Sequence, residues 1–208
     1  MHTLDHLVYA VPDLHAALDW FEEQAGLRPA IGGRHLQQGT HNAVINLNQG
    51  AYLEIVAVDP NNTAVAPPRW MGVDHITSPT MARWSLKSNN LEDQSAILQS
   101  INPALGTIHT GQRQLTSGEL LRWQMTLPLP DPAVDLIPFF LDWSTSDFHP
   151  TDRMEEAFSV LRIHLEHPEP VKIEAALKSL GITEPVAPAE QPGFAVHLMT
   201  PKGELVLC

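Results

Sequence analysis

The hydrophobic positions of this chain change between a strand period and a helix period in a fixed order. An apolar run over residues 4–11 predicts a strand, and Pro12-Asp13 follows it as a turn and a helix cap. Apolar residues then recur over residues 14–25 at the spacing of one helix face, and Gly26 stands where a left-handed residue ends a helix. Three further strand-like segments cover residues 27–35, 41–48 and 51–59. The pattern predicts a βαβββ unit.

The same order of elements recurs twice along the chain. Strand-like segments begin near residues 82 and 158, a helical stripe follows each, and Gly106 and Gly181 end these helices as Gly26 ends the first. The strands that follow cover residues 107–114, 120–127 and 134–143 in the second unit, and 184–189, 194–200 and 204–208 in the third. We therefore predict three units, over residues 1–80, 81–150 and a shortened 151–208, in one domain. A single unit leaves one sheet face uncovered, so we expect units to pair around a core.

The composition is that of a folded, acidic protein. Hydrophobic residues make up 43% of the chain, and 24 Asp and Glu against 12 Lys and Arg give a net charge of -12. This charge disfavours nucleic acid and anionic membrane surfaces as partners. Cys208 is the only cysteine, and neither a secretory signal nor an apolar run of membrane-spanning length is visible. We expect a cytoplasmic protein.

Four short motifs in the first unit resemble those of one protein family. They read Leu-Asp-His-Leu-Val-Tyr at 4–9, Gly-Gly-Arg-His at 32–35, Gly-Thr-His-Asn-Ala at 39–43 and Tyr-Leu-Glu-Ile-Val at 52–56. In these motifs the chain resembles the glyoxalase-like domain family of the vicinal oxygen chelate superfamily. The resemblance implies an α+β fold whose βαβββ units form a half-open mixed β-barrel cleft, with the helices outside. It also implies a divalent metal that chelates two neighbouring substrate oxygens.

Strand alternation directs two candidate ligands into that cleft. Leu7 should face the helix and His6 the cleft, and likewise Leu53 should face the helix and Glu54 the cleft. A His with a Glu suits Zn, Fe, Mn, Ni or Co, and the resemblance implies His6 and Glu54 as metal ligands. The same two residues can instead form a hydrogen-bonded pair that satisfies both.

The other units do not supply an obvious third ligand. Arg83 stands near the position that the superfamily uses for it, and an arginine cannot ligate a metal. Since a catalytic metal usually has about three protein ligands, we consider His41 and His35, which follow glycines at strand ends, together with His164 and Glu166. A lone histidine at a strand end is otherwise a surface or capping residue.

Arg83 also suggests a way of binding a ligand. A cation in the cleft of an acidic protein favours an anionic ligand such as a carboxylate, although it can equally pair with Glu54. We expect Asn42 and Trp84 to contact the ligand with Arg83, although Trp84, like Trp123 and Trp143, also fits a core position.

Two functions follow from these candidates. The first is an enzyme, a lyase, isomerase or dioxygenase, in which a metal on His6 and Glu54 polarises a small substrate and Glu54 or His41 moves a proton. The second is a non-catalytic protein that binds or sequesters an anionic or aromatic small molecule. Superfamily members pair their units within one chain or between two, so a homodimer is compatible with the resemblance.

Overall fold

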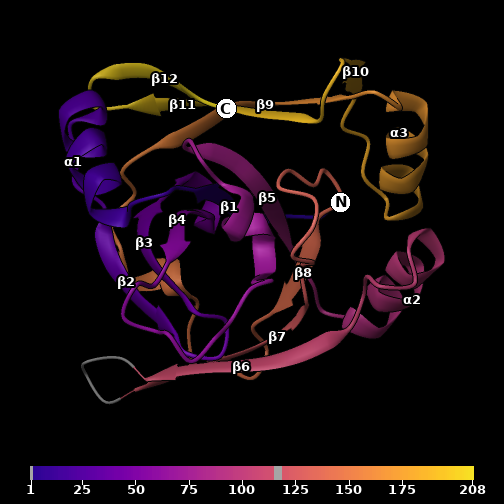
Figure 1. Ribbon diagram of the computed structural model, residues 1–208, viewed down its shortest axis with the longest axis horizontal. Helices are drawn as coiled ribbons and strands as arrows, with labels where there is room; N and C mark the ends of the chain where they lie inside the picture. The colour runs from indigo at the N-terminus through magenta and orange to yellow at the C-terminus, as the bar shows by residue number, and fades with distance from the viewer. Residues whose placement is uncertain (1, 115–118) are drawn as a thin grey trace.

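The computed structural model describes residues 2–114 and 119–208, and its elements follow the order strand, helix, three strands along each third of the chain (Figure 1). The first set is β1 (Leu4–Ala10), α1 (Leu14–Ala25), β2 (Ala30–His35), β3 (Thr40–Asn46) and β4 (Tyr52–Val58). The second is β5 (Thr80–Lys87), α2 (Leu91–Ile101), β6 (Ile108–Gln114), β7 (Leu120–Thr126) and β8 (Phe139–Asp142). The third is β9 (Ser159–His167), α3 (Pro170–Ser179), β10 (Val186–Pro188), β11 (Gly193–Thr200) and β12 (Gly203–Leu207). Short 3-10 helices η1 (Asn48–Gly50), η2 (Trp70–His75) and η3 (Pro150–Arg153) lie between them.

Helix α1 begins and ends at the residues that the sequence indicates. The Asp13 side chain accepts a hydrogen bond from the backbone N–H of Ala16 at 3.1 Å, and Gly26 adopts a left-handed conformation with φ of 79°. The apolar face of α1, which includes Leu18 and Phe21, is buried against the sheet. The predicted amphipathic helix is therefore confirmed.

Eight strands form one curled sheet in the order β2-β3-β4-β1-β5-β8-β7-β6. Its centre is the antiparallel pair β1–β5, and each of these strands has a parallel partner on its other side, β4 for β1 and β8 for β5. Two βαβββ sets of the same chain thus join side by side. The structure confirms the predicted α+β half-open barrel and shows that the first two sets pair within one chain. The boundaries proposed for three units stay a prediction.

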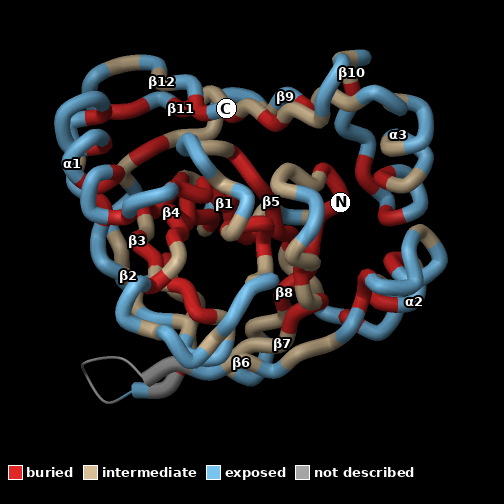
Figure 2. Tube along the Cα trace, in the orientation of Figure 1, coloured by how far each residue is buried: buried red, intermediate tan, exposed pale blue. Residues whose placement is uncertain are grey.

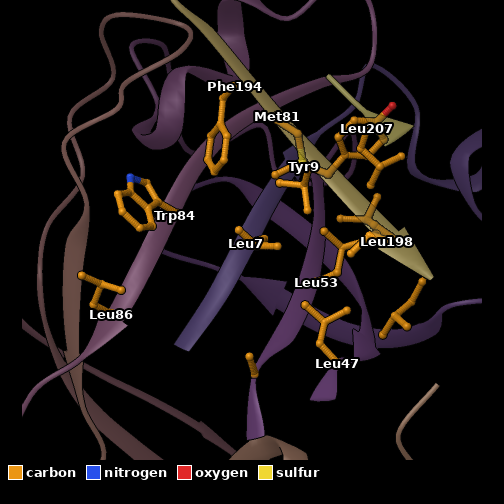
Figure 3. Packing of buried hydrophobic residues seen from close by; sticks show 14 of the residues in the cluster. Leu7, Tyr9, Leu47, Leu53, Met81, Trp84, Leu86, Phe194, Leu198 and Leu207 are labelled. Atoms are coloured by element: carbon orange, nitrogen blue, oxygen red, sulfur yellow. The ribbon is translucent and has the colours of Figure 1, made fainter. Parts of the chain in front are cut away.

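The last four strands form a separate sheet, in the order β10-β9-β11-β12, on the outer face of the curled sheet (Figure 1). Phe194 and Leu198 of β11 belong to the same buried cluster as Leu7, Leu53 and Trp84 of the curled sheet (Figure 3). Buried residues concentrate on the central strands β1, β4 and β5 (Figure 2). The third set of elements therefore encloses the outer core and leaves the inner face of the curled sheet open.

Strand β8 is shorter than the sequence predicts. We expected a strand over residues 134–143, and the structure has one only at Phe139–Asp142. The Pro-rich segment before it, residues 128–138, follows an irregular path and turns its backbone carbonyls towards β5. None of the described helices is long and apolar enough to span a membrane.

Candidate functional site

The inner face of the curled sheet lines a cavity of about 1120 Å³. Its two sides differ in chemistry. Strands β1 to β4 present mainly hydrogen-bonding side chains, namely His6, His35, Asn42, Tyr52 and Glu54. Strands β7 and β8 and the residue that follows β8 present apolar or aromatic side chains, namely Leu121, Trp123, Met125, Phe139, Leu141 and Trp143. We call these the polar wall and the apolar wall.

A buried carboxylate stands at the centre of the polar wall. Glu54 on β4 is only 5% exposed, and its Oε1 accepts a hydrogen bond of 2.6 Å from the Asn42 side-chain amide on β3. Its Oε2 lies 3.7 Å from Nε2 of His6, and Oε1 lies 3.8 Å from Nε2 of His35. Each oxygen of Glu54 therefore faces an imidazole nitrogen.

Three neighbours fix the ring of His6. Its Nδ1 is 2.7 Å from Oδ1 of Asp5, its face stacks on Tyr52 at 4.6 Å between ring centroids, and the edge of Phe139 approaches it at 5.2 Å. Because an ionised Asp5 only accepts hydrogen bonds, Nδ1 of His6 carries the proton that it donates. In neutral His6 this leaves the Nε2 lone pair directed at Glu54.

Asp5 connects His6 to a distant segment of the chain. It is fully buried, and its Oδ2 accepts hydrogen bonds from Nε1 of Trp143 at 2.8 Å and from Nε2 of His149 at 3.2 Å. Burial raises the pKa of Asp5, but the hydrogen bonds from His149 and His6 outweigh burial and hold this pKa below its usual range. Asp5 is therefore an ionised carboxylate that holds three donors in place.

A similar chain of contacts orients His35. Its Nδ1 lies 2.9 Å from Oγ1 of Thr40, and that oxygen accepts a hydrogen bond of 3.0 Å from Nε1 of Trp70. With its oxygen engaged by Trp70, the Thr40 hydroxyl can donate its hydrogen to Nδ1 of His35. In this arrangement Nε2 of His35 carries a proton that points at Glu54.

With this geometry established, comparison with known proteins identifies the family. The sequence model of the family described as the glyoxalase-like domain matches residues 4–181, which is most of the chain. The chain belongs to the glyoxalase-like domain family. It is thereby a member of the vicinal oxygen chelate superfamily, as the four motifs of the first unit indicate.

One solved structure agrees with this fold at low sequence identity, and a second is similar over part of the chain. A hypothetical protein from Staphylococcus aureus is similar over 100% of this chain and 85% of its own, with a TM-score of 0.60 and 18% identity. A methylmalonyl-CoA epimerase of Streptomyces coelicolor, in complex with 2-nitronate-propionyl-CoA, is similar over 70% of this chain and 97% of its own, with a TM-score of 0.44 and 14% identity. No curated protein matches the chain. At these identities the likeness concerns the fold alone.

The chelated metal of the superfamily does not fit the side chains of this glyoxalase-like domain. On β5 the residue paired with His6 is Ser85, and β8, the counterpart of β4, directs Phe139 and Leu141 into the cavity. Among residues 2–114 and 119–208, no group of three or more His, Cys, Asp or Glu is arranged to hold a metal ion. His6 and Glu54 therefore lie together as the sequence predicts, with His35 beside Glu54, but β5 and β8 add none of the ligands that the superfamily takes from the second unit.

Of the two predicted residues on β3, the structure brings one to the site. Asn42 lines the cavity and bonds to Glu54, so its role in binding a ligand stays a prediction. His41 is absent from the cavity lining and lies on the other face of β3, with its ring 6.5 Å from that of His15 on α1. Strand alternation turns His41 away from the cavity, so its catalytic role stays a prediction that this geometry does not support. His35, which we weighed beside it, is the histidine that faces Glu54.

The structure also places Arg83 outside the cavity, so its ligand-binding role stays a prediction that this geometry does not support. Arg83 is 1% exposed and does not line the cavity, because the Pro-rich segment covers it. Its guanidinium donates to the backbone carbonyls of Ala82, Leu129, Pro132 and Ala133. Burial lowers the pKa of Arg83. The sequence indicated an inward cation correctly but gave no sign of the backbone segment that receives it.

Trp84 and the third set of elements are likewise absent from the site. Trp84 is 3% exposed, donates from Nε1 to the Leu136 carbonyl and packs against Phe194 in the outer core (Figure 3). His164 and Glu166 pair with each other at 3.0 Å on the exposed face of the four-stranded sheet. These residues cannot contact a ligand in the cavity, since the curled sheet lies between.

Arg83→Met should destabilise the fold by about 3 kcal/mol, because the carbonyls that Arg83 now satisfies would stay buried without a donor. Urea unfolding followed by circular dichroism measures the change. Arg162→Met, at an exposed arginine of β9, is the matched control and should change stability by less than about 0.5 kcal/mol. Equal stability of the two variants would contradict a structural role for Arg83.

The sequence interpretation missed Asp5, the residue that orients His6. In a regular strand the side chain of Asp5 would point to the opposite face of the sheet from that of His6. The β1–β5 register shifts between Leu4 and His6, which places a β-bulge at Asp5. A bulge re-aims the side chain it carries and is common beside functional sites. The adjacent Asp-His pair was the only sign in the sequence.

Proposed function

We propose that this chain is an enzyme that transfers a proton on a small molecule with two neighbouring oxygens, and that Glu54 is the base. One observation carries the proposal: a buried carboxylate, open to a large cavity, has an imidazole nitrogen opposite each of its oxygens. Buried carboxylates beside histidines in a cavity are the usual equipment for moving protons. Glyoxalase-like proteins act on or bind small molecules, in keeping with this role.

The proposed reaction begins at a carbon–hydrogen bond next to a carbonyl. Glu54 takes the proton through Oε2, and the bonding electron pair moves into an enolate, so that negative charge develops on the carbonyl oxygen. The N–H of His35 Nε2 is the donor best directed to stabilise that charge. Return of the proton from Glu54 to the same carbon regenerates the substrate, and return to the neighbouring carbon, with a hydroxyl proton passing through Nε2 of His6, gives an isomer.

Deuterium exchange tests this reaction without knowledge of the natural substrate. The protein is incubated in D2O with neutral hydroxycarbonyl and dicarbonyl compounds, and proton NMR follows the carbon–hydrogen signals next to each carbonyl. We expect at least one compound to exchange faster with protein than in buffer alone. If compounds bind, as shown by calorimetry, and none of them exchanges, the proposed reaction is wrong.

A second function is favoured by the apolar wall. Four of its side chains, Leu121, Met125, Phe139 and Leu141, line the cavity and carry no reactive group. A protein that only sequesters an aromatic compound would need such a wall and would not need Glu54. The anionic ligand of that hypothesis loses its support, because Arg83 is covered. Binding without exchange is the result that would favour this function.

Two further expectations remain proposals. We propose a cytoplasmic location, with which the single exposed Cys208 is compatible. A homodimer also remains a proposal. It is not needed to close the half-barrel, because the two sets of strands that form the curled sheet come from one chain.

A further inference from the structure

The cavity is large for a small dicarbonyl compound. Its volume of about 1120 Å³ lies just above the range of roughly 300–1,000 Å³ that is typical of pockets for drug-sized ligands. Glu54 and its hydrogen-bonding neighbours lie on β1 to β4, whereas β7 and β8 supply the apolar wall on the other half of the curled sheet (Figure 1). Strand β6 adds the polar side chains of His109, Thr110 and Gln112 at the far edge of that half. A ligand that fills the space therefore has a small polar end and a much larger apolar body.

Trp123 gives the apolar wall a flat surface. Trp123 on β7 pairs directly with Gly111 on β6, and both residues line the cavity. A Cβ atom on Gly111 would lie only 2.4 Å from the Trp123 ring, so the indole rests on the glycine backbone. Trp143 packs beside it with 5.5 Å between ring centroids. Glycine at position 111 thus allows the indole to lie along the wall instead of projecting into the cavity.

The charged groups around the cavity do not favour an anion. Both arginines among the described lining residues already have carboxylate partners: Arg34 donates to Asp59 at 2.5 Å, and Arg153 pairs with Glu119 and lies over the Phe148 ring. No lysine is found among the lining residues that the structure describes. At the polar wall, Glu54 itself repels negative charge.

We propose that the cavity binds a neutral, flat aromatic ligand of at least two fused rings, which stacks on Trp123 and directs two neighbouring oxygens at Glu54. This ligand class is the substrate class that we infer for the site. The inference rests on the proposed function only in taking Glu54 as the base. The rings replace water on the apolar wall, and neutral hydroxyl or carbonyl oxygens meet the hydrogen-bonding groups of the polar wall.

Three related probes test the proposal by isothermal titration calorimetry. They are 2,3-dihydroxynaphthalene, its 6-sulfonate, and 2-naphthol, which carries only one oxygen. We expect the neutral diol to bind, and the sulfonate and 2-naphthol each to bind about ten-fold more weakly. Equal or tighter binding of the sulfonate, or no binding of the diol, would overturn the proposal.

Trp123→Leu should weaken binding of the diol by about five- to twenty-fold, because an aliphatic side chain cannot stack on the rings. Trp20→Leu is the matched control, since Trp20 is 39% exposed on α1 and outside the cavity lining. Gly111→Ala provides a second route: it retains the indole but forces it to move, and it should weaken binding in the same way. Unchanged affinity in both cavity variants, each folded by circular dichroism, would contradict stacking on Trp123.

Failure of this inference differs from failure of the proposed function. Tight binding of the diol that depends on Trp123, together with no deuterium exchange in any compound, would retain the ligand class and reject the reaction. Exchange of small hydroxycarbonyl compounds without any binding of the diol would retain the reaction and reject the ligand class.

Discussion

Glu54→Gln should lower the rate of deuterium exchange by about 10²- to 10⁴-fold, the range expected for loss of a general base. Glutamine has the shape of glutamate, and its oxygen can still accept the hydrogen bond from Asn42. Its amide would then face the Nε2 lone pair of His6 and donate to it, so the wall should keep its geometry. The variant loses only the ability to accept a proton. NMR exchange rates measured at several substrate concentrations separate this loss of rate from a loss of binding.

Glu166→Gln is the matched control for this experiment. Glu166 also lies beside a histidine, His164, but the pair is on the outer sheet and exposed to solvent. This control should exchange at the rate of the unchanged protein. If Glu54→Gln is folded and retains more than about a tenth of that rate, Glu54 is not the general base of the reaction.

Asp5→Asn should lower the exchange rate by about 10²-fold, because it moves the proton of His6 to Nε2, where the N–H would donate to Glu54 and weaken this carboxylate as a base. Asparagine has one acceptor oxygen where Asp5 has two. The Trp143 indole can only donate, so that oxygen should remain with Trp143 and the new NH₂ group should face Nδ1 of His6. His6 must then accept at Nδ1 and carry its proton on Nε2, which removes the lone pair directed at Glu54.

The spectrum of His6 provides a readout that loss of stability alone would not change. In ¹⁵N-labelled protein, the Nδ1 and Nε2 shifts of His6 should exchange character in Asp5→Asn, while Asp19→Asn, at an exposed site on α1, should leave them unchanged. A variant with the original tautomer and a normal exchange rate would show that Asp5 acts only as a structural anchor for Trp143 and His149.

Much of the fold could be predicted from local pattern. Helical spacing, Asp13 and Gly26 located α1, and the recurrence of strand, helix and strands indicated paired units, because these features depend on neighbouring residues in the sequence. The position of the third set of elements did not follow, since its apolar strand faces fit either side of the curled sheet. Only packing against Leu7 and Trp84 determines that it covers the outer face.

The candidate site could be predicted in part for the same reason. Alternation placed His6 and Glu54 correctly, as regular strands allow. It failed at Asp5, where a bulge interrupts the period. At Arg83 it could not show that a segment some fifty residues away covers the side chain. The apolar wall was missed because Trp123 in a strand has the pattern of a core residue, and only the curvature of the sheet opens a cavity beside it.

Dependence on metal is the most direct test of the central claim, which is that Glu54 and its oriented histidines transfer a proton without a chelated ion. The exchange rate is measured on one preparation before and after dialysis against EDTA, and elemental mass spectrometry gives the metal content of both samples. We expect far less than one metal ion per chain after dialysis and an unchanged exchange rate. A rate that falls with the metal content and returns when Zn, Fe, Mn, Ni or Co is added would contradict the claim and show that His6 and Glu54 serve as metal ligands after all.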